Sequence, residues 1–387
     1  MGMWFASCPK GLESLLVNEL ISLGAEKTRE TVAGVYVEGT LAFAYRACLW
    51  SRLANRVLLP LERFEVSSDF IGTNDAIRHT KFGAQQVKDA IVDQLQDYFG
   101  ERPDVDLQNP DLRINVRLAK GAATVSIDMS GGSLHKRGYR VAMVPAPLKE
   151  NLAAALLLRA GWPEIAARGG ALIDPLCGSG TFLIEGAMMV ADMAPGLIRE
   201  RFGFHGWAKH DDTLWQDIRQ EALARCEAGL SREIPEIRGY DKDTRAVSAA
   251  QENIACAGLE KWVRVMAKPI EAFKKPTHRE TGDGLIICNP PYGERWGEME
   301  ELKPLYQTLG EVAKRECPGW RMAVITGNAE LAGELRLRAD KKYQFFNGTI
   351  PSQLLLFQLR EADDRNPQPR SDESAAALGE GAQMFAN

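Results

Sequence analysis

The sequence predicts an α/β protein in which a doubly wound, mostly parallel sheet ends in an antiparallel hairpin and follows a smaller α+β region. From about Lys149 onward, short apolar strands alternate with helices, and the last two strands flank an Asn347-Gly348 turn. Before Lys149 the strand-like and helix-like pieces follow a different order. The 387 residues, 45% hydrophobic and 26% charged, are enough for two or three cores of a soluble chain.

The first 65 residues are predicted to form a small domain of the ferredoxin-like type. Residues 11–24 carry leucines at helical spacing, and residues 33–39 alternate apolar and other side chains with the period of a strand. A second helix over residues 41–54 then leads into a strand at residues 55–66. The resulting order β-α-β-β-α-β is that of the ferredoxin-like fold.

Residues 66–146 are predicted to form a second domain with a helix and a hairpin. The helix covers residues 83–100, and the hairpin covers residues 112–130 with a Lys120-Gly121 turn. Apolar residues alternate with Arg113 and Arg117 in the first hairpin strand. We therefore expect one face of the hairpin to be core and the other to carry arginines.

The distribution of charge points to a polyanionic partner. The whole chain has a net charge of -5, yet residues 112–149 hold seven Lys or Arg against a single acid, Asp128. Such local asymmetry is what nucleic-acid contacts require. We expect RNA phosphates to be bound by Arg113, Arg117, Lys136, Arg137 and Arg140.

Cysteine usage and hydropathy exclude other classes. The seven cysteines are scattered, odd in number and without a Cys-x-x-Cys pair, which supports neither a disulfide framework nor a metal site. No apolar run reaches the roughly 18 residues of a membrane helix. We expect a cytoplasmic protein that holds no metal.

Two predicted βα turns are candidates for a nucleoside pocket. In "ALIDPLCGSGT", Asp174 ends a strand, and Gly178 and Gly180 permit a ligand to approach the backbone before the helix at Thr181. A dinucleotide fingerprint would need a third glycine where Leu183 stands, and an ordinary turn without a ligand is the other alternative. In "GYDKD", Asp241 is placed to accept ribose hydroxyls. Taken alone, Asp241 fits a solvated helix cap better, and its position in the series of strand ends favours the ribose contact.

The third candidate is "ICNPPYGER" at the end of a strand. Pro290 and Pro291 fix the backbone and exclude a helix, so the segment is a stiff exit from the strand. Rigid carbonyls, the Asn289 amide and the Tyr292 ring suit a planar target that carries an NH2 group. A proline-rich turn without function is the alternative.

Together, "DPLCGSGT", "GYDKD" and "NPPYGER" resemble motifs of class I, Rossmann-like S-adenosylmethionine-dependent methyltransferases that modify exocyclic amino groups. With the basic N-terminal part, residues 1–360 resemble the THUMP-domain 23S rRNA guanine-N2 methyltransferases, with the THUMP domain at 66–146 and the methyltransferase domain at 147–360. The resemblance implies that catalysis uses Asn289, Pro290, Pro291 and Tyr292. It also implies that S-adenosylmethionine is bound by Asp174, Pro175, Cys177, Gly178, Gly180, Thr181, Asp241, Lys242 and Asn289.

Two segments depart from this pattern. Residues 193–233 insert far more than one crossover helix between the first two motifs, and we interpret them as structural or as an RNA contact rather than as catalytic. At the third strand, where these enzymes often place an acid near the adenine, Pro269 stands, with Glu271 two residues later. The adenine contacts are therefore not assigned.

The resulting hypothesis is methyl transfer to the N2 of a guanine in 23S rRNA or a large-subunit precursor. Adenine-N6 methylation of DNA and glutamine-N5 methylation of protein involve the same kind of planar NH2 target. A non-catalytic RNA-binding or ribosome-assembly protein with a vestigial fold is the alternative of a different class. Residues 361–387 are polar and rich in Pro, Ser and Ala, and we expect a disordered linker to a second methyltransferase domain downstream.

Overall fold

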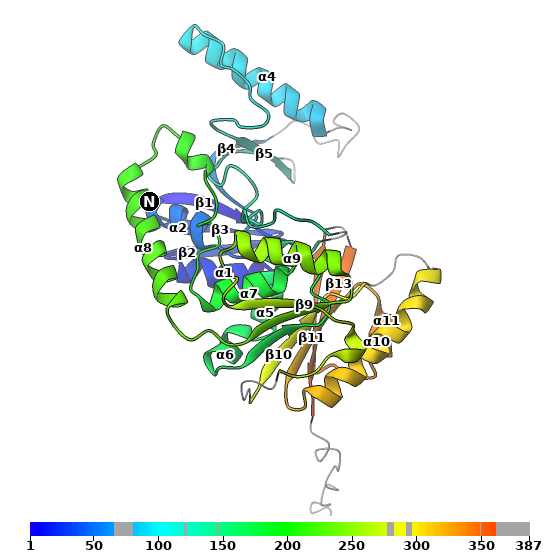
Figure 1. The fold of residues 1–387 in the computed structure, drawn as a ribbon. Helices are drawn as coiled ribbons and strands as arrows, with labels where there is room; N and C mark the ends of the chain where they lie inside the picture. The colour runs from blue at the N-terminus through cyan, green and yellow to red at the C-terminus, as the bar shows by residue number, and fades with distance from the viewer. Residues whose placement is uncertain are drawn as a thin grey trace, which may run out of the picture.

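The computed structural model describes residues 1–65, 80–119, 122–144, 147–276, 282–291, 296–348 and 350–360. The Lys120-Gly121 turn, Tyr292 and the predicted linker at 361–387 lie outside these ranges. Within them, no helix is both long and apolar enough to cross a membrane. The predicted α/β class is confirmed, with two sheets in consecutive parts of the chain (Figure 1).

The N-terminal part confirms the expected order β-α-β-β-α-β. Its six strands form one sheet in the order β2-β3-β1-β4-β6-β5, and every neighbouring pair is antiparallel. The elements are β1 (Gly2–Ser7), α1 (Glu13–Ser22), β2 (Lys27–Thr31), β3 (Gly34–Gly39), α2 (Leu41–Trp50), β4 (Arg56–Glu65), α4 (Thr80–Phe99), β5 (Ile114–Ala119) and β6 (Ala122–Asp128).

Strand β4 belongs to both N-terminal halves. Its first residues pair with β1, from Leu58 opposite Phe5 to Arg56 opposite Ser7. On its other side it pairs with β6 from Leu58 to Glu65. Helix α4 lies far from the second sheet, beyond β4 and β5 (Figure 1).

The expectation that one face of the 112–130 hairpin is core is wrong for its outer strand. Ile127 of β6 is buried, but Ile114 and Leu118 of β5 are 38% and 49% exposed. The reason is position, because β5 is the edge strand of the sheet and has β6 as its single neighbouring strand. Alternation indicates which side chains share a face, and it does not indicate what covers that face.

The second sheet has the order β12-β13-β11-β10-β7-β8-β9. Five consecutive strands, from β11 to the edge strand β9, are parallel, and β13 runs antiparallel to both β11 and β12, which confirms the predicted terminal hairpin. In its turn Gly348 has φ +66°, a conformation that glycine adopts without strain. The strands are β7 (Ala171–Asp174), β8 (Ile237–Asp241), β9 (Val263–Ala267), β10 (Gly284–Cys288), β11 (Arg321–Thr326), β12 (Lys341–Asn347) and β13 (Ile350–Gln358).

Helices cover both faces of this sheet, because strands in a parallel sheet need cover on both sides. One buried cluster joins one face of the sheet to α5 (Glu150–Arg159), α7 (Thr181–Val190) and α9 (Thr244–Cys256). The other joins the opposite face to α10 (Trp296–Glu316) and α11 (Ala329–Glu334). The first cluster continues into the N-terminal domain through residues such as Leu53 and Val57.

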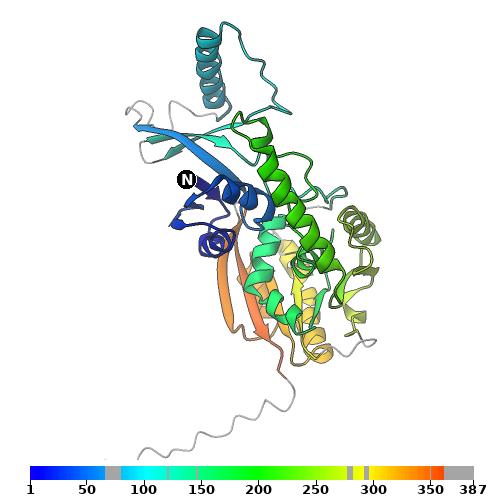
Figure 2. The ribbon, with the colours of Figure 1, turned by 90° about the vertical axis from the view of Figure 1, so that its left-hand side faces the viewer.

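The insertion at 193–233 holds the two parts of the chain together. Its helix α8 (Asp212–Leu230) runs alongside α2 (Figures 1 and 2). The Tyr45 hydroxyl of α2 lies 2.7 Å from His210 Nδ1, and the Tyr45 ring packs against Phe204 and Trp215. These contacts support the structural interpretation of the insertion.

Candidate cofactor and target-amine site

The sheet order brings the three predicted motifs to one edge. Strand β7 lies between β8 and β10, and all three are parallel. Asp174 at the end of β7, Asp241 at the end of β8 and Asn289 just after β10 therefore share the carboxyl edge. In open α/β sheets this edge is where ligands bind.

Asp241 holds the first loop in place. Its Oδ2 accepts a hydrogen bond from the Gly178 amide at 3.0 Å, and its Oδ1 accepts one from the Asp243 amide at 3.0 Å. The Cys177 amide also donates to the Tyr240 carbonyl at 2.9 Å. The cap at the next helix is Asp243, whose side chain accepts from the Arg245 amide. The alternative of Asp241 as a simple cap therefore does not describe its contacts.

The first loop leaves room above Gly178, whereas a Cβ at Gly180 would meet Ala250 Cβ at 3.3 Å. Gly178 and Gly180 have φ of +52° and +81°, which a glycine adopts without strain. A Cβ added at Gly178 would meet only Val144 Cγ2, at 3.8 Å, among the described residues. Pro175 and Cys177 are buried beneath this loop, whereas Lys242 at the end of β8 is exposed.

Asp174 is a buried carboxyl at the centre of the edge. It is 2% exposed, and one oxygen accepts from the Leu176 amide at 3.0 Å. Burial raises the pKa of Asp174 well above its ordinary value, and the nearby Asp241 carboxylate raises it further. A cationic ligand group above the loop would lower the pKa of Asp174 again, because an opposite charge favours the ionised carboxyl. Such a group is present in the ammonium and sulfonium of S-adenosylmethionine.

Asn289 presents a buried acceptor that the described part of the chain does not satisfy. Its Oδ1 has no hydrogen-bond partner there. Buried polar atoms are nearly always paired, so an unpaired one at a ligand edge needs an explanation such as a missing ligand. Pro290 is buried, and the Pro291 carbonyl accepts from the Tyr306 hydroxyl at 3.2 Å, which fixes the turn.

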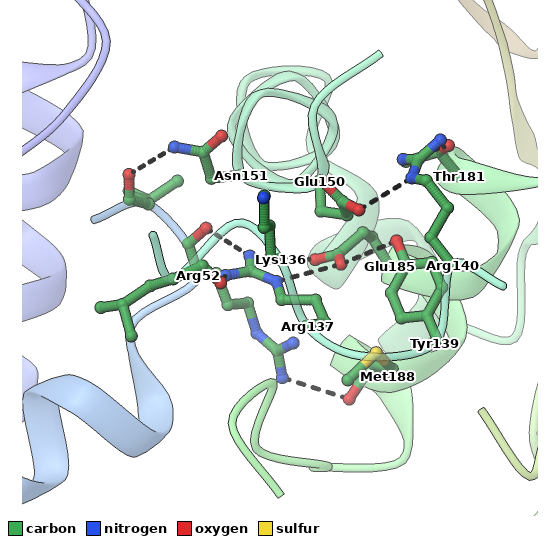
Figure 3. A network of polar contacts seen from close by, with 12 residues as sticks. Arg52, Lys136, Arg137, Tyr139, Arg140, Glu150, Asn151, Thr181, Glu185 and Met188 are labelled. Atoms are coloured by element: carbon green, nitrogen blue, oxygen red, sulfur yellow. Dashed lines mark hydrogen bonds and ion pairs between the residues drawn. The ribbon is translucent and has the colours of Figure 1, made fainter. Parts of the chain in front are cut away.

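The expectation that Arg137 binds phosphate is wrong. Its side chain is 1% exposed and pairs with Glu185 on α7, with Nε and Oε1 3.3 Å apart. Its other nitrogens donate to the carbonyls of Leu134 and Arg52 (Figure 3). The guanidinium is therefore satisfied inside the protein and is not accessible to RNA.

Arg140 is also a structural residue rather than a surface cation. Its Nε donates to Glu150 at 2.9 Å, and its terminal nitrogens donate to Ser179 Oγ at 3.2 Å and Thr181 Oγ1 at 3.1 Å. Figure 3 shows the side chain pointing from the 137–140 segment toward the start of α7. With 11% of its side chain exposed, Arg140 ties this segment to the glycine loop instead of facing solvent.

The remaining basic residues differ in exposure. Lys136 is exposed, whereas Arg113 and Arg117 are half-buried. The Arg117 guanidinium lies 5.2 Å from the centroid of the Phe5 ring. Of the five predicted phosphate contacts, Lys136 is the one that is exposed.

Sequence reasoning missed Asn253, a buried residue of α9. Its Oδ1 accepts from the amides of Val141 and Ala142, and its Nδ2 donates to the carbonyls of Ala142 and Ser179. It therefore joins residues 141–142 to the glycine loop. The available signal was an amide on the apolar face of α9, beside Ala250 and Ile254.

Comparison with known proteins agrees with these features. The family model described as RMKL-like, methyltransferase domain matches residues 137–355, the RlmL ferredoxin-like domain matches 4–58, and the THUMP domain matches 61–128. A protein of Cellvibrio japonicus named ribosomal RNA large subunit methyltransferase K/L is 53% identical, over 99% of this chain and 58% of its own length. The chain thus spans little more than half the length of such curated relatives.

Solved structures agree over almost the whole chain. The crystal structure of a possible methylase from Clostridium difficile 630 superposes with a TM-score of 0.79 at 30% identity, covering 95% of this chain and 99% of that one. The protein SMU.472, complexed with SAH, superposes with a TM-score of 0.78 at 30% identity, covering 93% of this chain and 98% of that one. The chain therefore belongs to the RMKL-like methyltransferase family.

Proposed function

We propose that this chain transfers a methyl group from S-adenosylmethionine to the exocyclic N2 of a guanine in 23S rRNA. The observation that carries the proposal is the Asn289 oxygen, which has no partner among the described residues and lies at the same sheet edge as Asp174 and Asp241. An acceptor beside a nucleoside pocket is what an NH2 target requires. The family and its named relatives support ribosomal RNA as the substrate class.

The residues at the edge fit the cofactor by their chemistry. The Gly178 loop gives backbone space, and the Asp241 carboxylate stands beside it to accept ribose hydroxyls. Asp174 lies beneath with a raised pKa, so a positive ligand group would restore its charge. The fit is supported by SMU.472, which holds SAH in a similar fold. The bound cofactor supplies an electrophilic methyl on a sulfonium.

The part played by this chain in transfer is alignment. The guanine N2 is a poor nucleophile because its lone pair is delocalised into the ring. With one N-H accepted by Asn289 Oδ1 and the other by the Pro290 carbonyl, the nitrogen lone pair is directed at the methyl group. The new N-C bond forms as the S-C bond breaks, and the nitrogen then releases a proton to solvent. Geometry rather than a strong base supplies most of the rate.

The proposal extends to features outside the described residues. Tyr292 would stack on the target base, which must leave its helix to reach the edge, at a cost of a few kcal/mol. A second methyltransferase domain downstream is also proposed, since the named relatives are longer than this chain. The cytoplasmic location expected from the sequence stays a prediction.

A second candidate is methylation of adenine N6. One similar structure, from Listeria monocytogenes, is described as a predicted N6-adenine-specific DNA methylase, at 29% identity and a TM-score of 0.77. The ferredoxin-like and THUMP regions favour RNA instead.

The decisive experiment incubates residues 1–387 with total bacterial RNA and labelled S-adenosylmethionine, followed by nucleoside analysis. Label in N2-methylguanosine from 23S rRNA supports the proposal. Label in N6-methyladenosine supports the second candidate. Cofactor binding without methyl transfer to RNA or DNA would support the alternative of a non-catalytic protein with a vestigial fold. Calorimetry with S-adenosylmethionine measures that binding directly.

A further inference from the structure

A separate pocket opens at the same carboxyl edge, over the three strands next to β10. It has a volume of about 250 Å³ and lies at the end of β11, where β12 and β13 rise beside it. Its lining includes Thr326, Asn328, Gln344, Phe346 and Gln353. None of these residues belongs to the proposed cofactor or target-amine site.

The register of the hairpin explains why the pocket exists. Strand β11 makes its last pair with β13 at Thr326 and Gln353. Strands β12 and β13 continue to pair beyond that level, as far as Asn347 opposite Ile350. The hairpin therefore overhangs the end of β11 by three pairs, roughly 10 Å. This overhang forms a wall above the turn that follows β11.

The lining suits a flat ring with polar edges. Gln344 and Gln353 are cross-strand partners, and their amides supply donors and acceptors. Phe346 is 37% exposed, so an incoming ring can contact it. Drug-sized ligands occupy roughly 300–1,000 Å³, and this smaller pocket suits a single heteroaromatic base.

The N-terminal domain adds a positive charge at this place. Lys10 is exposed, and its Nζ lies 5.2 Å from the centroid of the Phe346 ring. The loop around Lys10 is held against β12, because Arg159 donates to the Gly11 carbonyl at 2.9 Å and stacks over Tyr343. Figure 2 shows the N-terminal elements beside the terminal hairpin. A lysine next to an exposed ring is suited to a nucleotide, whose base stacks while its phosphate meets the charge.

We propose that this pocket binds an RNA base that flanks the methylated guanine, with Phe346 stacking on it and Lys10 meeting a neighbouring phosphate. This inference rests on the proposed function. Phe346 is on β12, three strands from β10 in the sheet order and roughly 14 Å across the sheet, which two or three nucleotides of single-stranded RNA can span. The subsite would fix the register of the RNA on the enzyme after the target base has left its stack.

Photo-crosslinking tests occupancy without turnover. Phe346 is replaced by the photoreactive benzoylphenylalanine, and the matched control carries it at Lys341, an exposed residue at the opposite end of β12. We expect irradiation with 23S rRNA to crosslink position 346, and not 341, to a nucleotide within about three positions of the methylated guanine. The inference is overturned if position 346 crosslinks to that guanine itself or to a distant site. It is also overturned if position 341 crosslinks with equal yield.

Kinetics provide the second measurement. We expect Phe346→Ala to raise the KM for 23S rRNA about tenfold, from the typical contribution of a base stacked on an aromatic ring. Lys10→Ala should raise it a few fold, and Lys341→Ala should leave it unchanged. The kcat and the Kd for S-adenosylmethionine should stay at the wild-type values. Unchanged KM in both variants, or a fall in kcat at unchanged KM, contradicts a flanking subsite.

The two proposals fail in different ways. If residues 1–387 methylate no RNA, the proposed function fails, and the crosslinking pattern at position 346 still decides whether RNA occupies the pocket. If the chain methylates 23S rRNA and position 346 neither crosslinks near the guanine nor affects KM, the flanking subsite alone is rejected. Melting temperatures identify a variant that has lost its fold.

Discussion

Arg137 and Glu185 form an ion pair inside the protein, with side chains that are 1% and 0% exposed. Arg137 follows the N-terminal sheet in sequence, and Glu185 lies on the helix that begins at the glycine loop. The Tyr139 hydroxyl donates to the same carboxylate at 3.1 Å. The pair therefore connects the segment that follows the N-terminal sheet with helix α7 through the core.

We expect Arg137→Leu to lower the free energy of unfolding by about 3–5 kcal/mol, because Glu185 is left as a buried charge without its partner. Urea denaturation measures the change. The double variant Arg137→Leu, Glu185→Leu removes both charges and should recover much of the loss. A single variant as stable as the wild type would contradict the role of the pair.

Lys136→Ala should weaken binding of 23S rRNA and reduce the slope of log Kd against log salt by about one, as expected for the loss of one phosphate contact. Filter binding between about 50 and 200 mM salt measures both. Lys341→Ala is the control, because Lys341 is exposed at the amino end of β12. An unchanged slope for Lys136→Ala places the RNA contacts on other residues.

Asn289→Ala should reduce kcat by about 10²–10³, the typical effect of deleting one preorganised polar group. The Kd for S-adenosylmethionine, measured by calorimetry, should change little, since the proposed work of this side chain is on the target amine. Asn289→Asp keeps an acceptor oxygen and should retain more activity. Equal activity of Asn289→Ala and the wild type would remove Asn289 from the mechanism.

Asp174→Asn should stabilise the ligand-free protein more at pH 8 than at pH 5. The pKa of Asp174 is raised by burial, so the folded protein holds this proton more tightly than the unfolded chain does. The stability of the wild type therefore falls as pH rises above the ordinary aspartate pKa. The asparagine variant does not lose this stability, because asparagine cannot ionise. We expect the difference in melting temperature between the variant and the wild type to be larger at pH 8 than at pH 5.

The control for this experiment is Asp243→Asn. The pKa of Asp243 is lowered, first by its hydrogen bond with Arg245, so its titration affects stability only below the ordinary aspartate pKa. Its effect on the melting temperature should be the same at pH 5 and pH 8. A constant difference for Asp174→Asn as well would contradict a buried, titrating Asp174.

The sequence predicted which strand ends lie together, but it did not predict which charged side chains are buried. Asp174, Asp241 and Asn289 each follow a short apolar strand, and parallel strands bring such positions to one edge, so their common location was predictable. Arg137 looks like a surface cation because its partner Glu185 lies 48 residues away. Asn253 contacts residues 112 positions earlier in the chain. Such long-range pairings leave no local period in the sequence.

Because β4 pairs with β1 on one side and with β6 on the other, the ferredoxin-like and THUMP regions share a backbone. A force on the outer strands β5 and β6 would pass along the hydrogen bonds of one continuous sheet into β1 and β3. Cutting the chain after residue 65 would strip β4 of its partner over seven residue pairs and expose an edge that invites aggregation. We therefore expect the two regions to unfold together.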